Sequence, residues 1–450
     1  MAKAEHPIRT LLRHAFRGAV AVYFRDIEVV GSLPPRETGG RLFASNHVNG
    51  LVDPMLVITS AKCSISPVAK STLWKIPGLS WLLGVADAVP IVRKRDEPNK
   101  SEKDNQAVFE RVGKHLAEGG NILIFPEGTS HNEPHLVPLR SGAGRMLAHA
   151  RSVGAANLTY QAVGLEFDQR EVFRSRVLVL YGPVRELREE GSLEGDALAR
   201  RVTEVLREDL SELLVEGKTW EERLLVARVA ELFANDAKDE TLQGLNAIGR
   251  QVEAARRTIA EDSPLLARVE QAVSRYYEAL AVSGTTDAIV ASREGRLGPR
   301  RPWTALALLL VLPLAIVGTV LYFLPYQVPR LVVRATRAEH DDVTSTYKFG
   351  TGLLLFPLWI ALSTGLGFAL LQLPLALAWA AVVMTSPFAA LAWQDRGPRL
   401  RGRLAGLLGS QAITELRALR AGAMALLAEA RAQVERAPEE AQAPREELTR

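Results

Sequence analysis

The chain has 450 residues, and its 55 lysines and arginines nearly balance 51 aspartates and glutamates, for a net charge of +4. This length exceeds one typical hydrophobic core, so two or three structural units are expected, and the charge balance argues against nucleic acid as the main partner. Cys63 is the one cysteine, so the chain can form no internal disulfide and no cysteine metal site, which favours a reducing, cytoplasmic setting for its polar part.

The first segment, residues 7–24, mixes large apolar side chains with Arg9, Arg13 and Arg17. Arg17 interrupts what would be the apolar core of a secretion signal, so cleavage and export are not expected. The pattern fits a basic amphipathic helix on an anionic membrane face, and we assign residues 1–37 to such an N-terminal membrane-surface helix. An ordinary surface helix of the following domain is the open alternative.

A polar stretch at residues 45–54 follows a short apolar strand predicted at 42–44. Asp53 before Pro54 is typical of a helix start, which places His47 on a strand-to-helix turn. A regular helix would not bring His47 and Asp53 onto one face, whereas a turn can. The carboxylate would then fix the tautomer of the imidazole and leave its other nitrogen as a base for a hydroxyl. The alternative is a hydrogen-bonded structural histidine and a routine helix cap.

The next strands each end in polar side chains. The strand predicted at 88–92 ends in a basic cluster that can bind a phosphate. The strand at 121–125 leads into a turn in which Glu127 is expected to be exposed and held in a defined direction, so that it could orient a substrate hydroxyl. A plain turn carboxylate is the alternative. Residues 138–145 then open a helix whose free backbone N–H groups suit an anion.

Two further strands, at 160–167 and 176–183, complete an alternation of strands and helices between about residues 40 and 185. This alternation predicts an α/β domain with a mostly parallel sheet flanked by helices, whose polar turns gather at the strand ends. We assign residues 38–190 to this domain.

Four blocks within that domain, in the same order, resemble the membrane glycerolipid acyltransferases, the group that includes glycerol-3-phosphate and lysophosphatidate acyltransferases. The blocks are residues 46–53 for the catalytic His/Asp block, 89–93 for the block with a phosphate-binding arginine, 125–130 for the third and 162–165 for the fourth. The first and third blocks together are fairly specific. The resemblance covers about residues 40–185, and residues 68–70 are also similar to a family segment.

Two departures from the family pattern refine the prediction. Five residues separate His47 from Asp53 where the family usually has four, and Ala162 stands where the fourth block usually has proline. The longer spacing, together with residues 173–176, resembles a fungal-type subgroup that acylates glycerol-3-phosphate or dihydroxyacetone phosphate. We therefore favour that first acylation, with lysophosphatidate acylation as the alternative.

The resemblance implies a direct acyl transfer. His47, aligned by Asp53, would take a proton from the acceptor hydroxyl as it attacks an acyl thioester, so no protein nucleophile is needed. The acyl donor would be acyl-CoA or acyl carrier protein as co-substrate, with no other cofactor. The implied substrate-binding residues are Asn46, Lys70, Arg93, Glu127, Gly128, Thr129 and Arg140. No metal site is expected, because Pro134 spoils the helical spacing of His131 and His135.

The remainder of the chain is predicted as an appended helical region at 191–300, membrane segments at 301–395, and a C-terminal helix with a disordered tail at 396–450. Residues 302–325 carry no charge and would span roughly 35 Å as a helix. Residues 349–393 are long enough for a hairpin that breaks near Gln372. Basic residues flank the first segment on both sides, so it either crosses the membrane or re-enters at Pro313.

These features predict an enzyme of early phospholipid biosynthesis in the inner or cytoplasmic membrane, with its catalytic domain facing the cytoplasm. Its partners would be the acyl donor, a glycerol phosphate or lysophospholipid, and the bilayer. Two alternatives come from other classes: a non-catalytic membrane adaptor that keeps the fold to bind lipid headgroups, and a hydrolase in which the same His/Asp pair activates water.

Overall fold

The structure is a computed structural model that describes residues 7–33, 40–76, 78–92, 103–292, 302–336, 344–408 and 410–436. Its internal contacts separate two units. The α/β unit comprises Met1–Leu214 and Pro325–Phe356, and the helical unit comprises Val215–Leu324 and Pro357–Arg450. We describe each unit by itself.

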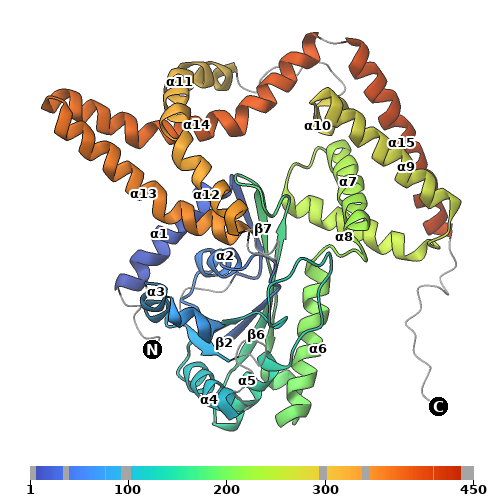
Figure 1. The fold of residues 1–450 in the computed structure, drawn as a ribbon. Helices are drawn as coiled ribbons and strands as arrows, with labels where there is room; N and C mark the ends of the chain where they lie inside the picture. Colours follow the sequence, from blue (N-terminus) through green and yellow to red (C-terminus); the bar gives the residue numbers. More distant parts are fainter. Residues whose placement is uncertain are drawn as a thin grey trace. The chain divides into compact units, whose positions relative to one another are not determined.

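A seven-stranded sheet in the order β1-β7-β6-β2-β5-β3-β4 forms the centre of the α/β unit (Figure 1). The strands are β1 (Asp26–Gly31), β2 (Arg41–Ser45), β3 (Ser66–Lys70), β4 (Val89–Ile91), β5 (Asn121–Ile124), β6 (Thr159–Phe167) and β7 (Arg176–Glu186). Every neighbouring pair is parallel except β6 and β7, which are antiparallel. The prediction of a mostly parallel sheet is confirmed.

Helices cover both faces of this sheet, which is why its central strands are continuous apolar runs. On β2, Leu42 and Ala44 join a core with helices α4 (Lys103–Ala117), α5 (Gly142–Ser152) and α6 (Gly195–Leu213). Phe43 points to the opposite core, beneath α1 (Pro7–Tyr23) and α2 (Val52–Ser60). The short helices η1 (Ser71–Lys75), α3 (Leu79–Val85) and η2 (Leu187–Glu190) complete this part of the unit.

The N-terminal segment differs in two ways from the helix predicted over 1–37. The helix α1 ends at Tyr23, and residues 26–31 form the edge strand β1, which pairs with β7 about 150 residues later in the chain. The three arginines of α1 point to the protein: Arg17 donates to the Thr59 carbonyl at the end of α2, at 2.6 Å. Leu11 is 69% exposed. A membrane-surface role for α1 stays a prediction.

The helical unit contains a bundle of α7 (Trp220–Ala237), α8 (Leu242–Thr258), α9 (Pro264–Ser283), α10 (Asp287–Ala291) and α15 (Ser410–Arg436). Leucines, valines and Tyr276 from four of these helices share one apolar core. The predicted helical region 191–300 is therefore divided, because α6 packs against the sheet in the α/β unit while α7 to α10 belong to the helical unit. The predicted C-terminal helix is present as α15, and the predicted disordered tail beyond residue 436 lies outside the described residues.

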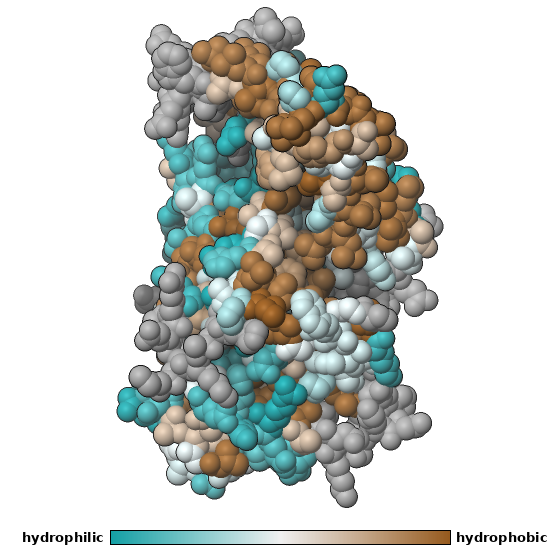
Figure 2. Space-filling view, turned by 90° about the vertical axis from the view of Figure 1, so that its left-hand side faces the viewer, coloured by the Kyte–Doolittle hydropathy of each residue, from teal (hydrophilic) through white to brown (hydrophobic). Residues whose placement is uncertain are grey.

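Two helices within the described residues are long and apolar enough to cross a membrane, Thr344–Leu370 in α13 and Leu373–Gly397 in α14 (Leu373–Leu408). The predicted break near Gln372 separates them. Both helices expose large apolar side chains, such as Leu354, which is 77% exposed. Figure 2 shows a broad hydrophobic area on the face of the molecule that it draws. Helix α11 (Pro302–Leu321) contains Pro313, and a bend of 48° separates it from α12 (Phe323–Thr336). Whether residues 302–325 cross a membrane or re-enter it stays a prediction.

Candidate active site

The turn between β2 and α2 brings His47 and Asp53 together, as predicted. His47 Nδ1 lies 3.0 Å from Asp53 Oδ2, and the same oxygen accepts the backbone N–H groups of Val48 at 2.8 Å and Asn49 at 2.7 Å. The Asp53 side chain is fully buried. Three donors thus converge on one carboxylate oxygen, and they fix the imidazole relative to the backbone of the turn.

The flat face of the His47 imidazole also packs against a second ring. Its ring stacks on that of Phe125, with 4.0 Å between centroids and 22° between planes. A carboxylate only accepts hydrogen bonds, so Nδ1 carries the hydrogen of the bond to Asp53, and in the neutral imidazole Nε2 then keeps its lone pair. His47 is 12% exposed and lines a cavity. The arrangement can serve as a base toward a hydroxyl in that cavity.

Glu127 is buried, not exposed as predicted. It is 3% exposed, its Oε2 accepts the backbone N–H of His47 at 2.5 Å, and its Oε1 lies 2.8 Å from His131 Nε2. The parallel pairing of β2 with β5 explains this, because it places the turns that follow Ala44 and Ile124 at the same edge of the sheet. Glu127 therefore positions the His47 turn, and its predicted contact with a substrate hydroxyl stays a prediction.

His131 is a site residue that the sequence pattern did not single out except as a weak metal ligand. Its Nδ1 accepts the backbone N–H of Glu133 at 3.1 Å, so its Nε2 donates to Glu127. Its backbone N–H donates to the His47 carbonyl at 3.2 Å. The four-residue spacing from Glu127 was the one available signal. Among the described residues, no group of three or more His, Cys, Asp or Glu side chains is placed to hold a metal ion.

The side chain of Asn46, which was predicted to contact the substrate, binds the protein backbone. Its Nδ2 donates to the Leu165 carbonyl at 3.1 Å, and its Oδ1 accepts the Leu165 N–H at 2.8 Å. The amide thus continues the pairing between β2 and β6 past the end of the strand, and it is 4% exposed. Because both polar atoms bind the backbone, the structure offers no reason to place Asn46 against a substrate.

The other predicted binding residues lie around the same cavity where the structure describes them. Gly128 has φ +78°, and a Cβ there would come within 2.6 Å of Arg140 Nε, so the arginine side chain lies directly across this glycine. Lys70, Gly128, Thr129 and Arg140 all line the cavity. Arg93 lies outside the described residues, so its predicted role in holding the phosphate stays a prediction.

The cavity has a volume of about 1440 Å³ and belongs entirely to the α/β unit. That volume exceeds the usual range of small-molecule pockets. Its lining has two chemical characters. The apolar part comes from α1, α2, η1 and α3, with Leu12, Phe16, Met55, Ile58, Leu73, Leu79, Leu82 and Leu83. The basic part includes Arg9, Arg13, Lys70, Arg140 and Arg145. Such a lining suits a ligand with a long apolar chain and an anionic group.

Comparisons with known proteins find similarity over the part of the chain that contains His47, Asp53 and Glu127. Residues 26–162 match the family described as Acyltransferase. The chain is 34% identical over 109 residues to glycerol-3-phosphate O-acyltransferase 2 of Saccharomyces cerevisiae, which covers 23% of this chain and 14% of that enzyme. It is 29% identical over 131 residues to lyso-ornithine lipid O-acyltransferase of Pseudomonas aeruginosa, 29% of this chain and 45% of that enzyme.

The crystal structure of the 1-acyl-sn-glycerophosphate (LPA) acyltransferase PlsC from Thermotoga maritima is similar with a TM-score of 0.33 and 16% identity, over 46% of this chain and 80% of that one. The chain thus spans less than half the length of the two curated relatives named above. Residues 26–162 are therefore similar to acyltransferases, among them the two curated relatives named above.

Proposed function

We propose that this protein is a membrane-bound acyltransferase that moves a fatty acyl group from an acyl thioester to a hydroxyl of glycerol-3-phosphate or dihydroxyacetone phosphate. The observation that carries the proposal is the His47–Asp53 pair, whose imidazole lines a cavity with both apolar and basic walls. A binding protein has no need of a histidine held by a buried carboxylate. An acyl transferase needs that base, an apolar space for the chain and cations for a phosphate.

The reaction follows from these groups. The acceptor hydroxyl gives its proton to Nε2 of His47 as its oxygen attacks the thioester carbonyl carbon. The tetrahedral intermediate then collapses, the carbon–sulfur bond breaks, and the leaving thiolate takes the proton from the imidazolium. Asp53 stabilises the charged imidazole in between. No acyl-enzyme forms, and the acyl donor is acyl-CoA or an acyl carrier protein.

The cations of the cavity support binding of a phosphate. Arg140 lies across Gly128, next to the Glu127 turn that contacts the His47 backbone, and Lys70 lines the same cavity from the end of β3. An arginine presents a fork that matches phosphate oxygens. We assign the acceptor phosphate to Arg140 and Lys70, with Arg93 as a third cation.

The choice of glycerol-3-phosphate over lysophosphatidate rests on two supports. The five residues between His47 and Asp53 resemble the fungal-type subgroup, and one of the similar relatives is the yeast glycerol-3-phosphate enzyme. Similarity to 1-acyl-sn-glycerol-3-phosphate acyltransferase BAT2 of Brassica napus, at 28% identity, supports lysophosphatidate as the second candidate.

The apolar helices α13 and α14 support attachment to a membrane, and we propose that the catalytic domain faces the cytoplasm.

An acceptor panel tests the proposal. The full chain, purified in phospholipid vesicles, receives labelled acyl-CoA or acyl carrier protein with glycerol-3-phosphate, dihydroxyacetone phosphate or lysophosphatidate, and the labelled products are separated. We expect the fastest ester formation with glycerol-3-phosphate or dihydroxyacetone phosphate. Fastest transfer to lysophosphatidate would establish the second candidate instead. Free fatty acid as the sole product would show a hydrolase, and no labelled product with any acceptor would support an adaptor.

A further inference from the structure

The first turns of α13 lie in the α/β unit, although α13 as a whole is long and apolar enough to cross a membrane. Ser345 is fully buried, and Phe349 is 3% exposed within the core that contains α1 and α2. The ring of Phe349 meets Tyr23 edge-on at 5.5 Å between centroids. Thr346 and Tyr347, between these two buried residues, line the cavity that contains His47. This segment is therefore part of the candidate site.

Thr346 makes a direct contact with the turn that holds His47. Its Oγ1 accepts the backbone N–H of Leu51 at 3.0 Å. Three other N–H groups of this stretch find their acceptors within it, because Val48 and Asn49 donate to Asp53 and Val52 donates to the Asn49 carbonyl. Leu51 directly precedes α2, where backbone donors have no partner inside the helix. Its N–H finds its acceptor on a helix almost 300 residues later in the chain.

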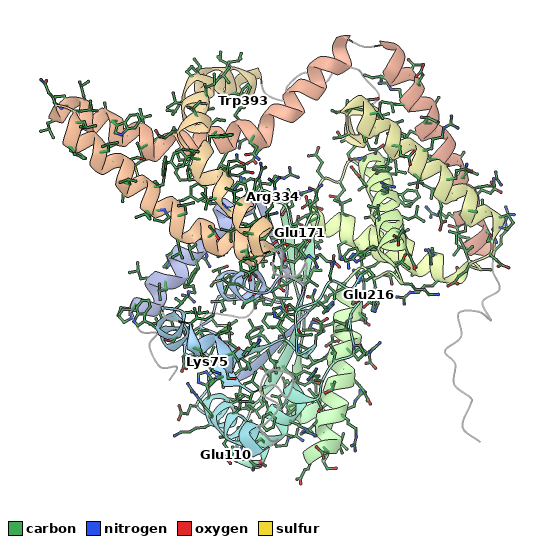
Figure 3. The ribbon with its side chains drawn as sticks, viewed as in Figure 1. Lys75, Glu110, Glu171, Glu216, Arg334 and Trp393 are labelled. Atoms are coloured by element: carbon green, nitrogen blue, oxygen red, sulfur yellow. The ribbon has the colours of Figure 1, made fainter. Side chains whose placement is uncertain are left out.

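Two further hydrogen bonds hold Thr346 in this place. Ser345 Oγ donates to the Arg170 carbonyl at 2.9 Å, and Lys348 Nζ donates to the Glu171 carbonyl at 2.6 Å. Of these residues, Figure 3 labels Glu171. Arg170 in turn donates from Nη1 to the His131 carbonyl at 3.4 Å. The start of α13 is thus fixed to the loop between β6 and β7, which also contacts the Glu127–His131 side of the site. Ser345 and Lys348, before and after Thr346 in the chain, thus fix its position, so that Thr346 can hold the turn in place.

We propose that Thr346 is a positioning residue for acyl transfer. By accepting the Leu51 N–H it fixes the 47–53 turn, and with it the direction of Nε2 of His47 toward the acceptor hydroxyl. Without that acceptor the turn gains freedom, and a misplacement of about 1 Å in a reacting group can cost on the order of 100-fold in rate. Full activity thereby depends on a helix that also carries a candidate membrane segment. The inference rests on the proposed function.

Three variants separate positioning from packing. Thr346→Val keeps the shape of the side chain and removes the acceptor, whereas Thr346→Ser keeps the acceptor and removes a methyl group. Thr344→Val makes the same change as the first variant two residues earlier, at a position that does not line the cavity. Each full-length variant in vesicles is assayed for kcat and KM with the acceptor that the wild type uses best, and for hydrogen exchange in peptides covering residues 47–53.

For Thr346→Val we expect kcat to fall about tenfold or more, with little change in the KM for acyl-CoA and with faster exchange in the 47–53 turn. Thr346→Ser and Thr344→Val should stay within about twofold of the wild type. Wild-type kcat in Thr346→Val, or an equal loss in Thr346→Ser, would overturn the positioning role while leaving the proposed function intact. A wild-type protein that acylates none of the three acceptors would refute the proposed function, and the positioning role with it.

Discussion

At the residue scale, the site consists of a base, its carboxylate and a set of backbone contacts that fix both. The His47–Asp53 contact could be predicted, because both residues lie on one turn and turn residues have recognisable sequence signals. The buried state of Glu127 could not, because it arises from the pairing of β2 with β5 across about 80 residues of chain. The pairing of Asn46 with the Leu165 backbone could not be predicted for the same reason, since the two residues lie more than 100 positions apart.

Glu127→Gln tests the positioning contact at this scale. The amide keeps the size of the side chain but cannot accept both hydrogen bonds as a charged carboxylate does. We expect a loss of about 1–3 kcal/mol in the free energy of unfolding, measured by urea titration, and a fall of about 10-fold or more in kcat. The matched change Glu133→Gln removes a charge from an exposed side chain in the same loop. Equal rates for the two variants would show that Glu127 does not position His47.

At the scale of elements, the α/β unit is a sheet whose polar turns gather at the ends of β2 and β5, with helices over both faces. The positions of β2, β4, β5, β6 and β7 were predictable because buried strands are short apolar runs, whereas β3 was not predicted as a strand. The strand β1 was missed, because six residues with a half-buried pattern carry little signal until β7 pairs with them. The bend of 48° between α11 and α12 was not predicted, and Pro313, where re-entry was one of two alternatives, lies inside α11.

The helix α4 gives a pH-dependent prediction. Burial lowers the pKa of His115, and the carboxylate of Asp87, 3.7 Å away, raises it by a smaller amount. The folded protein therefore takes up a proton on His115 less readily than the unfolded chain does. Above the unfolded pKa of about 6.5, this difference does not change the free energy of unfolding. Below that pH, it lowers the free energy of unfolding by an increasing amount. The free energy of unfolding, measured by urea titration, should fall less between about pH 7.5 and about pH 5.5 in His115→Asn than in the wild type.

The exposed His135 supplies the control for this experiment. His135→Asn should follow the wild-type curve, because the substitution changes an exposed side chain and removes no buried group. An identical pH slope for His115→Asn and the wild type would show that His115 does not contribute to the loss of stability in acid.

At the scale of the whole molecule, the chain combines an α/β unit that holds the site with a helical unit that contains most of the apolar membrane-type helices. The sequence indicates the spans at 349–393 and their break, because long uncharged runs are a strong signal. It did not indicate that the first turns of α13 contribute Thr346 and Tyr347 to the cavity. Contacts of that kind join residues almost 300 positions apart and leave no local pattern.

A buried charge ties the helical unit together and gives a prediction for it. Asp287 on α10 is 1% exposed and accepts from Tyr276 Oη at 2.6 Å, from Asn235 Nδ2 at 2.7 Å and from Arg420 Nε of α15 at 2.8 Å. Asp287→Asn weakens all three bonds, although Arg420 keeps its ion pair with Asp236. We expect the free energy of unfolding of this unit to fall by about 2–3 kcal/mol.

Hydrogen exchange locates that loss. Peptides from α7, α9, α10 and α15 should exchange faster in Asp287→Asn, whereas peptides from β2 and β5 should not change, because the two units have separate cores. The reverse pattern, faster exchange in β2 and β5 with an unchanged helical unit, would contradict the role given to Asp287.

The central claim is that His47, held by Asp53, is the base for acyl transfer. The most direct measurement is the rate of labelled acyl transfer by the full-length His47→Ala variant in vesicles, beside His135→Ala, which changes an exposed histidine outside the cavity. We predict that the transfer rate of His47→Ala falls about 100-fold or more while this variant remains bound to the vesicles. His135→Ala should transfer at the wild-type rate. Transfer by His47→Ala at close to the wild-type rate would contradict the account.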